Sequence, residues 1–279
     1  MRNIKPETIT QAVKKSLLKI NYALEDSFVV TLKKARDKEK SELSRSIMDD
    51  IIDNQEIAKK GVNPLCQDTG LVVVFAKIGQ DAYIDGTLEA SINEGVRQAY
   101  KEGFLRKSVV NHPFNRENTT DNTPAVIHTS LVKGDKITLK IAAKGAGSEN
   151  MSKVAMLKPT DGIDGVKQLV KDTIFNAGGR PCPPIIVGIG LGGNLEKSAL
   201  LAKEALLRDL DERSEDQSIA ALEDTLLDEI NALGVGPMGV GGETTCVGVK
   251  INTYPMHIAS LPVAVNIQCH ANRHEEVII

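Results

Sequence analysis

Residues 61–79 read GVNPLCQDTGLVVVFAKIG, and in this stretch a polar motif runs directly into a strongly apolar segment. The apolar half, LVVVFAKIG, is rich in valine and bounded by glycines, a pattern typical of a buried strand. The polar half sets the thiol of Cys66 beside an amide, a carboxylate and a hydroxyl. A core cysteine has apolar neighbours and a zinc hook has a second cysteine close by, so neither explains this motif.

Helical patterns flank this stretch on both sides. In 5–24 and in 39–61, apolar residues recur at helical spacing and charged residues occupy the other faces. The same periodicity predicts further helices, at 87–104, 163–179, 195–207 and 216–234. Short apolar runs also predict strands, at 184–193, 246–258 and 261–269.

Two more strand patterns, at 124–132 and 137–145, are separated only by the turn KGDK, and together they predict a β-hairpin. Because helices are interspersed with strands and a hairpin is expected, a purely parallel sheet is not. We therefore expect an α+β (mixed α/β) fold, with mixed and antiparallel sheets surrounded by helices. The chain is expected to form a single domain, with a helical N-terminal part at 1–62 and an α/β part at 63–279.

The composition argues against several classes of partner. Lys and Arg number 34, Asp and Glu number 37, and the formal net charge of −3 gives no reason to expect nucleic acid. Aromatic residues make up only 3% and tryptophan is absent, which argues against recognition through stacking platforms. No apolar run reaches membrane-spanning length and the N-terminus lacks a signal-peptide core, so we expect no membrane contact and a cytoplasmic location.

Three of the four cysteines occupy similar places in the sequence. Cys66, Cys182 and Cys269 each lie at the end of an expected strand beside polar or rigid loop residues, where α/β proteins gather ligands. Cys246 lies among alternating residues inside a strand, as a buried structural thiol does. On composition alone, four buried thiols are the more frequent arrangement. Three converging thiolates would instead suit zinc with a fourth ligand, or an iron–sulfur cluster with one iron left open as a Lewis acid.

Four further side chains have the chemistry that a substrate site beside such a cluster needs: Gln67, Asp68, Arg106 and His257. Three of them also have an ordinary alternative, Arg106 as a surface arginine, Asp68 as a turn cap and His257 as a strand residue. Residues 106–123 form a polar segment without periodicity, and segments of this length in compact domains are often functional.

Seven short motifs in one order carry a resemblance to a known family. They are CQDTG at 66–70, LRKSVV at 105–110, KGAGS at 144–148, CPP at 182–184, GVGG at 239–242, PMHIASLP at 255–262 and CHANR at 269–273. In this order they resemble the alpha subunit of class I fumarases, and are similar to the alpha subunit of the related tartrate dehydratases. The resemblance covers nearly the whole chain.

The resemblance implies a role for each candidate residue. It implies that Cys66, Cys182 and Cys269 ligate a [4Fe-4S] cluster, that Gln67, Arg106 and Gly147 bind the substrate, and that Asp68 and His257 are catalytic. An arginine suits the carboxylate clamp because its planar fork matches a carboxylate, and a glycine lets the backbone approach a ligand closely. The family usually reads KGGGS, so Ala146 is a departure.

The resemblance implies that the chain is one subunit of a hydro-lyase that reversibly hydrates fumarate to (S)-malate. A separate beta subunit would complete the site and supply the base that removes the C3 proton, in a heterotetramer of two alpha and two beta chains acting on a small dicarboxylate. Three alternatives stay open: a tartrate dehydratase alpha subunit, a non-catalytic iron–sulfur binding or sensor protein, and a zinc-binding structural protein.

Overall fold

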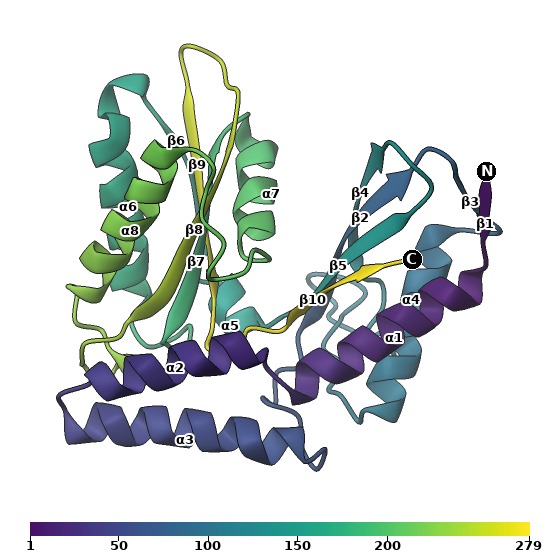
Figure 1. The fold of residues 1–279 in the computed structure, drawn as a ribbon, viewed down its shortest axis with the longest axis horizontal. Coiled ribbons are helices and arrows are strands. Elements are labelled where there is room, and N and C mark those ends of the chain that lie inside the picture. Colours follow the sequence, from purple (N-terminus) through teal and green to yellow (C-terminus); the bar gives the residue numbers. More distant parts are fainter. The chain divides into compact units, whose positions relative to one another are not determined.

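The structure is a computed structural model that describes residues 1–279, and it contains two compact units, each made of segments that are separate in the sequence (Figure 1). Unit 1 comprises residues 1–24, 55–146 and 273–279, and unit 2 comprises residues 25–54 and 147–272. The expected single domain, with a helical part that ends at residue 62, stays a prediction about domain organisation.

Unit 1 contains a four-stranded sheet with the strand order β10-β5-β2-β4, and a two-stranded parallel sheet formed by β1 and β3. Its elements are β1 (Arg2–Ile4), α1 (Pro6–Tyr22), β2 (Leu71–Gly79), β3 (Ala82–Ile84), α4 (Leu88–Glu102), β4 (Val126–Val132), β5 (Ile137–Lys144) and β10 (His274–Ile278). The core lies where α1 and α4 pack on one face of the larger sheet. Pro6 begins α1, and the apolar stripe Ile9, Val13 and Leu17 is fully buried, as the helical spacing predicts.

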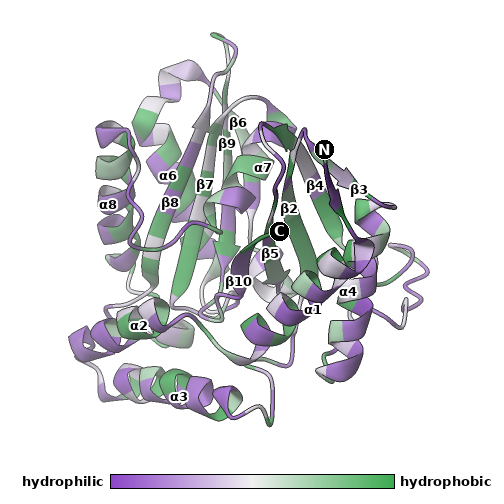
Figure 2. Cartoon of the chain, turned by 45° about the vertical axis from the view of Figure 1, so that its right-hand side comes forward, coloured by the Kyte–Doolittle hydropathy of each residue, from purple (hydrophilic) through white to green (hydrophobic).

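The predicted hairpin between 124–132 and 137–145 is wrong. Both segments are strands, but β2 lies between them, antiparallel to β5 and parallel to β4. The reason is the apolar stretch LVVVFAKIG, which forms β2. Val72, Val73 and Val74 are all at most 4% exposed, so β2 is buried on both faces and takes the central position of the sheet. Figure 2 shows β2 as one of the most hydrophobic strands of the chain.

Unit 2 contains a second mixed sheet, with the strand order β6-β9-β7-β8. Its elements are α2 (Asp26–Lys38), α3 (Glu42–Lys59, whose last residues belong to unit 1), α5 (Ala146–Glu149, whose first residue belongs to unit 1), β6 (Lys153–Leu157), α6 (Gly162–Ala177), β7 (Ile185–Gly192), α7 (Leu195–Ala205), α8 (Gln217–Asn231), β8 (Cys246–Tyr254) and β9 (Leu261–Gln268). β7 runs parallel to β8 and antiparallel to β9. The helix α2 was not predicted, whereas the other long helices were.

The central strand β7 has a different helix layer on each face (Figure 1). Ile185, Val187 and Ile189 contribute to the core with α6 and α8. The alternate positions Gly188 and Gly190 face α7, where a Cβ atom would lie 2.2 Å from the carbonyl oxygen of Ala202 or 2.0 Å from that of Ser198. The glycines therefore let α7 approach the strand backbone more closely than any side chain would allow.

Interspersed helices and mixed sheets confirm the predicted α+β class. None of the helices combines the length and the apolarity needed to cross a bilayer. The cytoplasmic location stays a prediction.

Candidate active site

Two of the three predicted ligand cysteines lie at the same end of the sheet in unit 2. Cys182 comes just before β7 and Cys269 directly after β9, and the antiparallel register pairs Ile186 with Gln268 at that end. The loops that carry the two thiols are joined directly, because the backbone N–H of His270 donates to the carbonyl oxygen of Cys182 at 3.3 Å. Neither cysteine forms a disulfide, and both are partly exposed, so a ligand can approach their sulfur atoms.

Cys182 sits in a constrained backbone conformation. Its φ of +56° lies in the left-handed region, which is uncommon for a residue with a side chain. Its N–H donates to the carbonyl oxygen of Gly179, and Nδ1 of His270 lies 3.0 Å from its own carbonyl oxygen. Strain of this kind persists where the surroundings hold a residue in place, and it often marks functional positions.

Cys66 belongs to unit 1, where the CQDTG motif forms the turn that leads into β2. Its thiol is free, partly exposed and 3.4 Å from Oε1 of the exposed Gln67. Gly70 makes the turn with a φ of +84°, so the glycine is required there. The expectation that Cys66 meets the other two cysteines stays a prediction.

Asp68 is fixed by backbone amides of two loops. Its Oδ1 accepts the N–H of Gly70 at 3.1 Å, and its Oδ2 accepts the N–H of Ala146 at 2.7 Å. The carboxylate therefore ties CQDTG to the KGAGS loop, the third motif of the sequence. Each oxygen keeps a further lone pair, so the partly buried side chain can still exchange a proton with a bound molecule.

The polar segment 106–123 packs against the same turn. Oγ1 of Thr69 donates to the carbonyl oxygen of Arg106 at 3.1 Å, and the Arg106 side chain is exposed. The fully buried Asn122 donates from Nδ2 to the carbonyl oxygen of Gly70 and accepts the N–H of Ser108 through Oδ1. Unit 1 thus places the backbone of Arg106 against the turn that carries Gln67 and Asp68, and that the three side chains share a substrate stays a prediction.

Gly147 follows directly after the amide that holds Asp68. It is exposed, and a Cβ at this position would meet only the carbonyl oxygen of Arg180, at 3.5 Å. The position therefore has open space beside its backbone, which is what close approach by a ligand requires. Its role in substrate binding stays a prediction.

His257 lies at the opposite end of the unit 2 sheet from Cys182 and Cys269. It follows β8, whose last residue, Tyr254, pairs with Gly192 at the far end of β7. The strand length of β7 separates the two ends by about 25 Å. His257 is exposed and lines an open pocket of about 600 Å³, in which Nζ of Lys197 lies over the ring of Tyr254. The structure therefore does not bring His257 to the two cysteines of its own unit.

Cys246 has none of the properties of a ligand. It is 2% exposed in the core of unit 2, and burial raises the pKa of its thiol to about 12. Metals bind the thiolate, and a buried thiol of this kind stays protonated at neutral pH. This agrees with the prediction from its place in the sequence.

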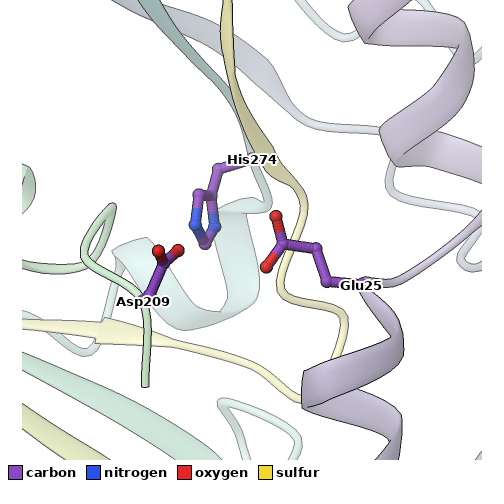
Figure 3. A group of neighbouring side chains, drawn as sticks. All are labelled: Glu25, Asp209 and His274. Atoms are coloured by element: carbon purple, nitrogen blue, oxygen red, sulfur yellow. The ribbon is translucent and has the colours of Figure 1, made fainter. Parts of the chain in front are cut away.

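Two further carboxylates of unit 2, Glu25 before α2 and Asp209 after α7, are exposed and are drawn in Figure 3 with His274, the first residue of β10 in unit 1. Exposed acidic side chains are common without a bound ion, and we assign them no site.

The sequence reasoning missed a buried arginine beneath the CQDTG turn. Arg273 is 1% exposed, and its Nη1 donates to the carbonyl oxygen of Asp68 at 2.7 Å and to Oδ1 of Asn21 at 3.1 Å. The hydroxyl of Tyr100 supports the same turn by donating to the carbonyl oxygens of Thr69 and Gly70, and burial raises the pKa of that hydroxyl. Arg273 ends the CHANR motif, so its place in a motif was the available signal.

Comparison with known proteins identifies relatives whose similarity covers most of the chain. The chain is 47% identical over 249 residues to a Methanocaldococcus jannaschii protein provisionally named L(+)-tartrate dehydratase subunit alpha, and the match covers 87% of each chain. It is 30% identical over 275 residues to the L(+)-tartrate dehydratase subunit alpha of Escherichia coli O157:H7, with 97% of this chain and 90% of the relative covered; the protein of strain K12 gives the same values. The sequence pattern of the family described as fumarate hydratase (Fumerase) matches residues 10–278, and the chain therefore belongs to that family of hydro-lyases.

Proposed function

We propose that this chain is the alpha subunit of an iron–sulfur hydro-lyase that reversibly hydrates fumarate to (S)-malate. One observation carries most weight: Cys182 and Cys269, from segments far apart in the sequence, share one end of a sheet, and both are partly exposed cysteines outside any disulfide. Membership of the fumarate hydratase family supports the reaction class. The printed names of the relatives favour a second candidate, an L(+)-tartrate dehydratase subunit alpha.

The residues fit a [4Fe-4S] cluster bound by three cysteines. Soft thiolates are the ligands that iron–sulfur clusters use, and Cys66, Cys182 and Cys269 are partly exposed, whereas Cys246 is buried. When bound, such a cluster supplies a Lewis-acidic iron without a protein ligand, which polarises the hydroxyl and the adjacent carboxylate of the substrate. Every other task falls to side chains of the two subunits.

In unit 1, three side chains would receive the substrate. The exposed guanidinium of Arg106 holds one carboxylate, because its fork donates two parallel hydrogen bonds. Gln67 donates from its amide to an oxygen of the substrate. Asp68 moves the proton on the hydroxyl side, and its two bonds to backbone amides keep the carboxylate in one orientation while it does so.

His257 needs a different explanation from the one that the sequence suggested. A side chain about 25 Å from Cys182 and Cys269 cannot reach a substrate held beside them in the same chain. If His257 is catalytic, it acts in a site to which another chain supplies the cysteines. The two alpha chains of the expected heterotetramer with two beta chains would allow this.

The experiment is anaerobic reconstitution followed by kinetics with and without a beta subunit. We expect an iron–sulfur absorption band that Cys182→Ser and Cys269→Ser abolish and Cys246→Ser retains. Hydration of fumarate should require the beta partner, and full activity of this chain alone would refute the split site. Dehydration of (S)-malate and of L(+)-tartrate in parallel separates the two substrates, while a cluster without either activity would favour a sensor.

A further inference from the structure

A buried glutamate of unit 2 is not explained by the proposed reaction. Glu39 follows the last residue of α2 and is 1% exposed. Its Oε2 accepts the backbone N–H of Glu243 at 2.9 Å, and its Oε1 accepts the N–H of Thr244 at 2.7 Å. A buried carboxylate is costly unless its oxygens are hydrogen-bonded, and here both oxygens bind one short stretch of backbone.

That stretch directly follows the glycine-rich segment 236–242, whose backbone conformation favours glycine at several positions. Gly239, Gly241 and Gly242 have φ values of +82°, +89° and +131°. A Cβ on Gly242 would lie 2.6 Å from Oε2 of Glu39, so the absence of a side chain is what admits the carboxylate. The hydroxyl of Ser44 adds a second tether by donating to the carbonyl oxygen of Gly241 at 2.8 Å.

The other side of segment 236–242 packs against the loop that carries Cys182. A Cβ on Gly239 would lie 2.6 Å from the Cα of Gly179, so the two backbones are in direct contact. The N–H of Met238 donates to the carbonyl oxygen of Pro183 at 2.9 Å, one residue after the cysteine. The N–H of Cys182 in turn donates to Gly179. The segment therefore touches the cysteine loop on both sides of the thiol.

We propose that Glu39 is a positioning residue for Cys182, acting through segment 236–242. Its carboxylate holds residues 243–244, which directly follow the segment, and the segment contacts Gly179 and Pro183, so that Cys182 keeps its left-handed conformation and its thiol stays only partly exposed. The inference rests on the proposed function only in taking Cys182 as a ligand. Glu39 does not itself bind the cluster, because it is buried beneath the backbone of 243–244 and only 1% exposed.

The test measures the cluster-free protein, so its outcome does not depend on activity. In Glu39→Gln the side chain keeps its size, but its NH2 group faces one backbone N–H and leaves that donor without an acceptor. We expect iodoacetamide to modify Cys182 about tenfold faster than in the unchanged protein, because loss of a charge-assisted bond raises local opening by about that factor. Cys66, in unit 1, is the internal reference and should react at an unchanged rate. Glu42→Gln, an exposed acid three residues further on, is the matched control.

Hydrogen exchange of the Glu243 and Thr244 amides reports on the tether itself and should accelerate in the same variant. Ser44→Ala removes only the second tether, so it should also raise the rate at which iodoacetamide modifies Cys182, by a smaller factor. This variant replaces Glu39→Gln in the test if Glu39→Gln fails to fold. Glu39→Asp, which keeps the charge, should recover part of the effect. Faster exchange of the two amides with an unchanged Cys182 rate would overturn the proposal, as would an equal rise at Cys66. Failure of the proposed function would appear instead as absence of the cluster in the unchanged protein.

Discussion

Replacing Gly70 by alanine tests whether the turn beneath the active-site motif depends on contact as well as on backbone freedom. The residue has a φ of +84°, and a Cβ there would lie 2.8 Å from both the carbonyl carbon of Ala143 and the amide nitrogen of Lys144. The left-handed conformation costs a residue with a Cβ about 1–2 kcal/mol. Overpacking adds about 1–3 kcal/mol, towards the upper end because backbone of the neighbouring β5 cannot rotate away. We expect a loss of about 4 kcal/mol in the free energy of unfolding.

Gly61→Ala supplies the matched control. Gly61 has nearly the same φ, +79°, but nothing lies within 4 Å of its Cβ position. This variant should therefore lose only the free energy that the left-handed conformation costs. The chain has no tryptophan, and equilibrium urea unfolding followed by circular dichroism, with hydrogen exchange of β2 and β5 peptides, gives the free energies. Gly70→Ala should lose at least about 1 kcal/mol more than Gly61→Ala. Equal losses would show that the close approach to β5 has no energetic weight and would refute the reasoning.

Three further outcomes follow from single sites. Gly147→Ala should leave the melting temperature unchanged, because its Cβ is 3.5 Å from Arg180, and should raise the KM for the dicarboxylate roughly tenfold if substrate occupies that space. Iodoacetamide at pH 8 should modify Cys246 at least roughly a hundredfold more slowly than the other cysteines, because its thiol has a pKa of about 12; equal rates would contradict its burial. The hydroxyl and backbone N–H of Ser218 lower the pKa of Asp216, the N-cap of α8, below 3.8, so its stabilisation is present above that value and is lost as pH falls through the lower folded pKa. In thermal unfolding, Asp216→Ala should therefore be less stable than the unchanged protein at pH 7, and the difference should shrink as the pH falls below 3.8.

Local patterns predicted most of the elements because they are properties of short segments. The helical periodicity of 5–24 and the apolar run of β2 need no knowledge of the rest of the chain. Strand order is different, since it depends on which strand is buried on both faces. The KGDK turn between β4 and β5 favoured direct pairing, but the hydrophobic β2, distant in sequence, gains more by lying between them.

The burial of Glu39 and Arg273 could not be predicted from the sequence for a related reason. Glu39 begins a polar stretch, EKSE, and Arg273 stands in a polar C-terminal motif, so exposure was the natural expectation for both. Each is at most 1% exposed because remote segments supply its partners, backbone amides for Glu39, and a backbone carbonyl together with the neutral side chain of Asn21 for Arg273. Backbone partners leave no trace in the composition of the segments that provide them, whereas a salt bridge would at least have offered an opposite charge to look for.

The difference between backbone and side-chain partners also explains the effect of having alanine, not glycine, at position 146. The KGAGS loop serves Asp68 through the N–H of residue 146, which any residue except proline provides, and the Ala146 side chain is exposed. Its neighbour Gly145 is less replaceable, since a Cβ there would lie 3.1 Å from Oδ2 of Asp68 and 3.4 Å from Nη2 of Arg273. A methyl group at 146 therefore leaves the carboxylate in place, whereas one at 145 would push on both charged groups beneath the turn. Of the two positions 145 and 146, the family pattern is therefore broken at the one where an added side chain disturbs Asp68 less.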